Sequence, residues 1–450
     1  MKRKTRINIL VMILFVAVIL NACVSEEKPA SNEEPVTVIT EDNSTEEETV
    51  SSPESEQKPS AKNNDLIQHH HTGHEYVHGE DGYFNLLESG IDYELMGQVS
   101  GTCWICASSC AMSTAYQMKY DEPIKFDQIE LVNEIYDDDR EEGIIVSDDV
   151  DKGKYGGLWI FVLNELSRGF GDGLVMDGLI EAAGWSEDEI KEGIQKYGAL
   201  YIGIPDTNNR KAYRDNYRTL NAPDAKHEDM DHSIAVVGWD DHFPKEYFRD
   251  EPSQDGAWIT YNSSYAGEYY YVSYDTPFDQ EIDTPVFMSV SRDYSKVLSH
   301  DGGMWTRDPV RTGDETTVAN VFKEKGTLAA AGTYIMADDS DLTIQIMTPD
   351  FKECLYSQDA HVDNIGYHVF TFEKPLEVDE YAVVISFSKG APVEGESLDV
   401  EGLGDIRIVS EKGQSYILLD GEWLDMSEKS TWKKLGRTTN NACIRALYAN

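Results

Sequence analysis

The chain has 450 residues, of which 83 are acidic and 38 are basic, so its formal net charge at neutral pH is -45. This length leaves room for two or three domains, each large enough to bury a hydrophobic core. A charge this negative argues against nucleic acid and other polyanions as partners, and it favours solubility outside the cell.

The amino terminus resembles an export signal. Basic residues up to Arg6 precede the apolar run from Ile7 to Leu20, which is too short for a comfortable membrane span. Because Cys23 directly follows Ala22, residues 1–22 resemble a bacterial lipoprotein signal, whose cysteine would be lipidated. This predicts a protein anchored through Cys23 to the outer face of the cell membrane. An ordinary cleaved signal or an uncleaved anchor is the alternative.

Residues 23–78 are predicted to form a disordered linker. Glu, Ser, Thr, Pro and Asn dominate most of this segment, so it cannot bury enough apolar surface to offset the entropy lost on ordering. Its last part, His69–His78, holds five of the eleven histidines. Such a tract can bind zinc or copper, or it can be a solvated part of the linker.

Residues 79–290 are predicted to form an α+β domain. Small and apolar residues recur at helical spacing over Cys103–Tyr120, with Gly101 marking the entry. Further helices are indicated after Gly156 and after the capping residue Ser186. Strands are predicted next, at residues 199–204, 231–239, 256–264 and 268–274. A helical half therefore precedes a β-rich half.

Residues 291–450 have a different character. Turn residues separate short apolar segments and helical periodicity is scarce, which is typical of a β-sandwich or jelly roll. The predicted strands are residues 317–322, 328–335, 342–346, 367–372, 381–387 and 443–448.

Cys103 is the candidate nucleophile. A thiol at a helix start lies beside unpaired backbone N–H groups and the positive end of the helix dipole, which favour the thiolate. Trp104 can shield such a site from water, and Gly101 lets the backbone approach a substrate. Cys106 and Cys110 fall on about the same side of the helix; they are small packing residues or, alternatively, part of a metal site.

Two later residues complete a possible catalytic set. His232 and then Asn262 follow Cys103 in the chain, each on a predicted strand of the β-rich half. A cysteine nucleophile needs a base within hydrogen-bond reach, and that imidazole needs a third group that fixes its tautomer and orientation. Helix-borne thiol, strand-borne imidazole and strand-borne amide can supply these roles across a cleft.

Three segments resemble the signature blocks of papain-like cysteine peptidases: Gln98–Ala107, Asp231–Gly238 and Asn262–Tyr274. The resemblance covers about half of the chain, from Gly79 to Pro285. The downstream part resembles the lectin-like β-domain that accompanies such peptidases in some bacterial surface proteins, on the segments Gln414–Ile417, Gly421–Trp423 and Cys443–Ala446.

The resemblance implies a role for each site residue. Cys103 would be the nucleophile, His232 the general base and later the acid, and Asn262 the group that orients the imidazole. Gln98 would complete the oxyanion hole beside the backbone N–H of Cys103. It lies one position nearer to the cysteine than is usual in the family, and Ser264 stands where the family commonly places a tryptophan.

The sequence therefore predicts an exported, membrane-anchored peptidase that hydrolyses peptide bonds through a thioester, without a cofactor or metal. Its partners would be a peptide or protein substrate and a cell-surface glycan or protein at the C-terminal domain. A surface adhesin with a degenerate peptidase domain is the alternative from another class. A cell-wall amidase with a Cys–His pair fits the location but not Asn262.

Overall fold

The computed structural model describes residues 76–79, 81–93, 96–136, 141–145, 156–169, 173–206, 212–214, 217–265, 268–302, 308–400 and 404–450. The predicted signal, Cys23 and His69–His74 lie outside the described residues. His78 is described, and its ring stacks on Tyr83 with the ring centroids 3.7 Å apart. Among the described helices, none is both long and apolar enough to cross a membrane.

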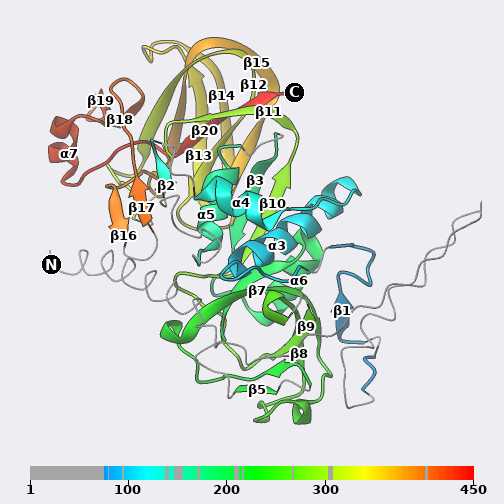
Figure 1. Cartoon of the computed structure of the whole chain (residues 1–450). Helices are drawn as coiled ribbons and strands as arrows, with labels where there is room; N and C mark the ends of the chain where they lie inside the picture. The colour runs from blue at the N-terminus through cyan, green and yellow to red at the C-terminus, as the bar shows by residue number, and fades with distance from the viewer. Residues whose placement is uncertain are drawn as a thin grey trace, which may run out of the picture.

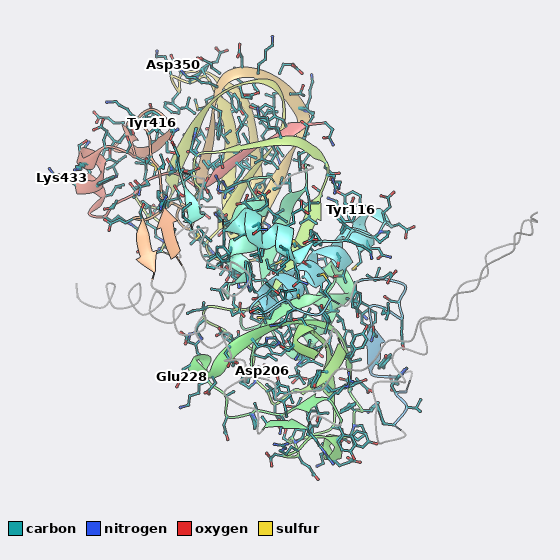
Figure 2. All side chains as sticks on the ribbon, in the orientation of Figure 1. Tyr116, Asp206, Glu228, Asp350, Tyr416 and Lys433 are labelled. Atoms are coloured by element: carbon teal, nitrogen blue, oxygen red, sulfur yellow. The ribbon has the colours of Figure 1, made fainter. Side chains whose placement is uncertain are left out.

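Figure 1 shows three tiers, with helices in the middle and strands above and below them. The α-helices within the described residues are α3 (Cys103–Tyr120), α4 (Gln128–Ile135), α5 (Trp159–Leu166), α6 (Glu187–Tyr197) and, far from the others, α7 (Lys429–Leu435). Side chains in Figure 2 mark the tiers: Asp206 and Glu228 belong to the lower one, whereas Asp350, Tyr416 and Lys433 belong to the upper one.

Helix α3 runs through the centre of the molecule. Its residues from Cys103 to Tyr116 are all buried. Small side chains let both faces approach neighbours closely, so the helix packs against α4 and α5 on one side and against strands on the other. The packing is close at Gly157, for example, where a Cβ atom would lie 2.3 Å from the indole of Trp104 and would clash with it. The helix ends at Asp121, which takes the left-handed conformation.

The strands of the lower tier surround a core of their own and pair antiparallel, except for the short parallel pairing of β6 with β9. Strand β7 is central: it pairs with β4, β8 and β1, and β8 pairs in turn with β9. Helix α6 covers part of this sheet, and its first turn carries a capping box between Ser186 and Glu189. The strands are β1 (Tyr83–Asn85), β4 (Leu200–Pro205), β5 (Tyr213–Arg214), β6 (Thr219–Leu220), β7 (Met230–Asp240), β8 (Ala257–Asn262) and β9 (Glu268–Ser273).

Two very long antiparallel strands, β12 and β15, dominate the upper tier. The sequence predicted two short strands in place of each, and that prediction is wrong. The polar segments between the predicted strands do not turn; they continue as exposed, bulged parts of one strand. The strands here are β11 (Tyr294–Ser299), β12 (Thr316–Ile335), β13 (Ser340–Met347), β14 (Cys354–Val362), β15 (Gly366–Phe387), β18 (Ser415–Leu419), β19 (Glu422–Asp425) and β20 (Ile444–Ala449).

Strand pairing joins the upper tier to the middle one. The start of β15 pairs with β3 (Val175–Glu181), and β3 also pairs with β10 (Val286–Ser291). In a separate three-stranded sheet, β17 (Gly404–Arg407) lies between β16 (Leu398–Val400) and β2 (Gly143–Ile145). The hydrophobic core around α5 also includes Tyr334, Tyr367 and Cys443 from the C-terminal part. The two parts therefore share backbone ladders and a core.

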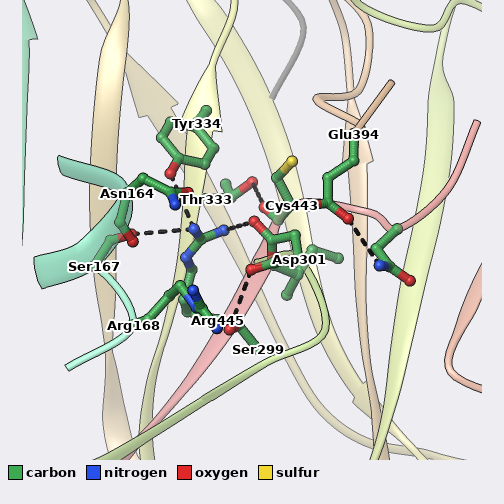
Figure 3. Close-up of polar contacts among 12 residues, drawn as sticks. Asn164, Ser167, Arg168, Ser299, Asp301, Thr333, Tyr334, Glu394, Cys443 and Arg445 are labelled. Atoms are coloured by element: carbon green, nitrogen blue, oxygen red, sulfur yellow. Dashed lines mark hydrogen bonds and ion pairs between the residues drawn. The ribbon is translucent and has the colours of Figure 1, made fainter. Parts of the chain in front are cut away.

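A buried arginine lies at this junction (Figure 3). The guanidinium of Arg445 forms an ion pair with Asp301, and both side chains are buried. Its Nη2 also donates to Ser167 Oγ at 3.1 Å and to the Tyr334 hydroxyl at 3.0 Å. Ser167 caps the end of α5, so a single side chain from β20 binds an element of the middle tier. Nearby, Asn164 of α5 donates to the carbonyl of Gly302 at 3.2 Å.

Candidate active site

His232 and Asn262 lie side by side. His232 is near the start of β7 and Asn262 is the last residue of β8, the antiparallel neighbour of β7. Their side chains are buried, and His232 Nε2 is 2.9 Å from Asn262 Oδ1. The same oxygen accepts from the backbone N–H of Ser264 at 3.1 Å. Because an N–H must point at an oxygen, this contact fixes the amide orientation, so His232 donates through Nε2–H.

Cys103 is the first residue of α3, and its thiol interacts with the His232 imidazole. Burial by itself lowers the pKa of His232, but the charge on Cys103 and a hydrogen bond to its sulfur outweigh burial and raise the pKa to about 9. Asp206 and the hydrogen bond that His232 donates to Asn262 act in the same direction. With Nε2 engaged by the amide, Nδ1 is the nitrogen left for the sulfur. The arrangement favours a thiolate–imidazolium pair at neutral pH.

Gln98 joins the same group of residues. Its Oε1 accepts from Ser263 Oγ at 2.9 Å and from Ser264 Oγ at 3.1 Å, and its amide nitrogen donates to the carbonyl of Ser100. Ser264 Oγ also lies 3.3 Å from His232 Nε2. The Ser264 hydroxyl therefore links Gln98 to the imidazole, at the position where the resemblance expected a tryptophan.

Gln128 is a further residue that supports the site. From the first turn of α4, its Oε1 accepts from Thr102 Oγ1 at 2.8 Å and from the Val99 N–H at 3.0 Å, while its amide nitrogen donates to the Gly97 carbonyl at 3.1 Å. It thus fixes the backbone that leads into Cys103. The sequence does not reveal Gln128, because its partners precede α3 in the chain whereas Gln128 follows that helix. No local pattern relates two segments that are separated in this way. The sequence does identify Ser264 as a departure from the family pattern, but it does not predict the contacts of Ser264 with Gln98 and His232.

The other cysteines of α3 have a different environment. Burial and the charge on Cys103 raise the pKa of Cys106 to about 12, and burial raises the pKa of Cys110 further. Both thiols therefore stay protonated at neutral pH and are poor nucleophiles. None of the cysteines in the described part of the chain forms a disulfide. Within the same residues, no group of three or more His, Cys, Asp or Glu side chains is placed to hold a metal ion.

The chain has the fold of a papain-like cysteine peptidase joined to a lectin-like domain, as predicted from the sequence. Residues 298–448 match the family model of the lectin-like domain. The solved structure of the clostridial cysteine protease Cwp84 after propeptide cleavage superimposes with a TM-score of 0.66 at 16% identity, over 81% of this chain and 98% of that one. No curated protein matches the sequence.

A second solved structure supports the same fold. It comprises the cysteine protease and lectin-like domains of Cwp84, a surface-layer-associated protein of Clostridium difficile. It gives a TM-score of 0.65 at 16% identity and covers 82% of this chain and 89% of that one. At this identity the likeness establishes the fold, and the roles of individual residues must be argued from the geometry of this chain.

Proposed function

We propose that this protein is an exported cysteine peptidase that hydrolyses peptide bonds through a thioester acyl-enzyme. The observation that carries the proposal is the set of contacts among Cys103, His232 and Asn262, in which the imidazole bonds to the amide on one side and to the thiol on the other. An activated thiolate, a proton carrier and an orienting amide are the three groups that this reaction needs.

The proposed reaction begins when the Cys103 thiolate attacks the scissile carbonyl carbon. The negative charge on the resulting tetrahedral oxygen would be stabilised by the Cys103 N–H and by the second N–H of the Gln98 amide, since the first bonds to Ser100. One such donor is worth roughly 3–4 kcal/mol. His232 then gives its proton to the leaving amine. It next removes a proton from water, whose hydroxyl cleaves the thioester and regenerates the thiolate.

The cellular setting is part of the proposal. The lipoprotein-like signal and Cys23 support export and attachment to the outer face of the membrane, and the structurally similar Cwp84 is surface-layer associated. We take residues 79–290 as the peptidase domain and residues 291–450 as the lectin-like domain, connected to the anchor by the linker at residues 23–78. A peptide or protein would be the substrate, and a surface glycan or protein would bind the lectin-like domain.

A surface adhesin is the second candidate function. The match of residues 298–448 to the lectin-like family favours it, because a binding domain needs no working peptidase site beside it. Glycan-array binding without hydrolysis of denatured casein would support the adhesin. Casein hydrolysis that is abolished by a thiol alkylator would exclude a degenerate peptidase domain.

Selective alkylation tests the proposed nucleophile. Iodoacetamide at pH 6 is expected to modify Cys103 far faster than Cys106 or Cys110, because only Cys103 has an imidazolium partner and the pKa of Cys106 is raised to about 12. Peptide mapping by mass spectrometry gives the labelling rate at each site, in a Cys354→Ser background that removes the exposed thiol. Labelling of Cys106 or Cys110 before Cys103 would contradict the assignment.

The pH profile of kcat/KM tests the proton carrier. The reaction requires protonated His232, whose pKa is raised to about 9, so activity should persist through neutral pH and fall as pH rises through about 9. The Asn262→Ala variant loses a hydrogen bond that raises this pKa, so its alkaline limb should move to lower pH. An alkaline limb that stays at the same pH in this variant argues against the proposed role of Asn262.

A further inference from the structure

A ring of three buried side chains lies beside the proposed catalytic pair. Tyr201 of β4, Ser233 of β7 and Asp283, which lies between β9 and β10, are all buried. The Tyr201 hydroxyl is 2.6 Å from Asp283 Oδ1 and 2.7 Å from Ser233 Oγ, and Ser233 Oγ is 2.9 Å from Asp283 Oδ2. Each of the three groups therefore contacts both of the others at hydrogen-bond distance.

The number of protons in this ring decides the state of the acid. Three short oxygen–oxygen contacts need three protons, because two oxygens this close without a proton between them repel each other. Tyr201 and Ser233 supply one proton each. The third must come from Asp283, which then donates from Oδ1 to Tyr201, while Tyr201 donates to Ser233 and Ser233 donates to Oδ2. Every donor and acceptor contact in the ring is then satisfied.

The charges around the ring agree with a neutral acid. Burial raises the pKa of Asp283 to about 8, and the charge on Asp279 acts in the same direction. The hydrogen bonds with the Tyr201 and Ser233 hydroxyls lower this pKa but do not outweigh burial. The Cys103 thiolate acts in the same direction as Asp279. The neighbouring histidine does not compensate Asp283, because His227 bonds to Asp279 at 2.8 Å. The titratable groups facing Asp283 are Cys103 on α3, Tyr201 on β4, Asp279 on its own loop and, through Asp279, His227.

The ring also touches the catalytic strand. Ser233 follows His232 on β7 and pairs in register with Gly203 of β4. Gly203 leaves room for the acid, because a Cβ atom at this position would lie 2.8 Å from the Asp283 side chain. We propose that Asp283 keeps its proton in the folded protein at neutral pH and, as a neutral acid, is a positioning residue that fixes Ser233 and hence His232. The positioning role rests on the proposed function, whereas the protonation does not.

The Asp283→Asn variant is the central test. The amide is a neutral isostere of the protonated acid, since its N–H can donate to Tyr201 and its oxygen can accept from Ser233. Denaturant unfolding from pH 4 to 8 should show wild type losing stability relative to the variant as pH rises. The unfolded carboxyl ionises near pH 4 while the folded one keeps its proton up to about pH 8. The relative folding constant should change about tenfold per pH unit within this window.

Controls separate this effect from a structural one. In the Asp350→Asn variant the same substitution is made at an exposed carboxyl whose pKa is lowered to about 2 by bonds to Lys352 and Thr348. Its stability difference from wild type should not vary from pH 4 to 8. If the stability difference between Asp283→Asn and wild type is also independent of pH from 4 to 8, the proposal is overturned. The infrared difference spectrum of wild type minus Asp283→Asn at pH 7 gives an independent readout, because it should contain the C=O band of a protonated carboxyl.

A second variant covers the case in which Asp283→Asn does not fold. Tyr201→Phe removes the hydroxyl that contacts the Asp283 carboxyl. The carboxyl band of this variant should therefore lie at a different frequency from that of wild type. If no protonated-carboxyl band differs between the spectra of wild type and Tyr201→Phe, the proposal is also overturned.

Activity gives the last test. The kcat/KM of Asp283→Asn should stay within about threefold of wild type at pH 7, whereas that of Asp283→Leu should fall at least tenfold. If wild type itself has no peptidase activity, the proposed function fails, while the stability and infrared arms still decide the protonation.

Discussion

Replacing Cys103 by alanine is expected to lower kcat for peptide hydrolysis by about 10⁴- to 10⁶-fold. In the proposed reaction the Cys103 thiolate forms the acyl bond, and removal of a nucleophile from a catalytic triad costs this much in other enzymes. The remaining rate should still exceed that of the reaction in water, because Gln98 and the helix N–H groups can stabilise the charge on the carbonyl oxygen.

Cys106→Ala is the matched control for this variant. Cys106 lies one turn further along the same helix and is also buried, so both substitutions remove one sulfur from α3. The control should keep kcat within a few-fold of wild type, because burial holds the Cys106 thiol in its protonated form. A fluorogenic peptide assay, with thermal melting to show that both variants fold, gives the comparison. Equal losses in the two variants would mean that Cys103 acts through packing and not as the nucleophile.

Local sequence signals were sufficient for the central helix and for four strands of the lower tier, β4, β7, β8 and β9, but not for the short strands β1, β5 and β6. The helical spacing predicted Cys103–Tyr120, and α3 has the same bounds. His232 and Asn262 were found because strand signals and chain order placed both on neighbouring strands, and the structure brings their side chains to 2.9 Å. Short-range periodicity carries this information, since each element shows its buried face within a few residues.

Features that depend on distant segments could not be predicted in this way. The pairing of β15 with β3 joins the C-terminal part to a strand that precedes most of the lower lobe in the chain, and no local pattern encodes it. The ring around Asp283 likewise combines β4, β7 and a loop. The turn residues between the apolar segments 317–322 and 328–335 predict two strands, although Lys323–Thr327 are the partly exposed middle of a single strand. Polarity reports exposure, and an exposed strand resembles a loop in sequence.

The sequence indicates that Arg445 is buried and needs a partner, but it does not identify the partner. It stands between Ile444 and Ala446 in a buried strand, and an arginine in such a position must have a partner, because an unpaired buried charge is costly. The sequence does not say which acid supplies the pairing. The structure identifies Asp301, which precedes β12 and is far from Arg445 in the chain.

Arg445→Met is expected to lower the free energy of unfolding by about 3–5 kcal/mol, because it leaves the Asp301 carboxylate buried without its cation. Burial raises the pKa of Asp301, and Arg445 opposes that rise, so loss of the guanidinium makes ionised Asp301 still less stable. Arg437→Met is the matched control. Arg437 pairs with Asp308 at 3.1 Å, but both side chains are partly exposed, so its loss should cost at most about 1 kcal/mol.

The Asp301→Leu/Arg445→Met double variant separates a buried charge from lost packing. It removes both charges, so it should recover a large part of the stability that Arg445→Met loses, since apolar replacements of a buried pair are often tolerated. Urea unfolding followed by tryptophan fluorescence measures all four proteins. The single variant should still unfold the peptidase helices together with the C-terminal strands, because the pairing of β15 with β3 and the shared core remain. A separate, early transition of the C-terminal strands in this variant would instead show that the lost Arg445 contacts, including the bond to Ser167 at the end of α5, are what couples the two parts.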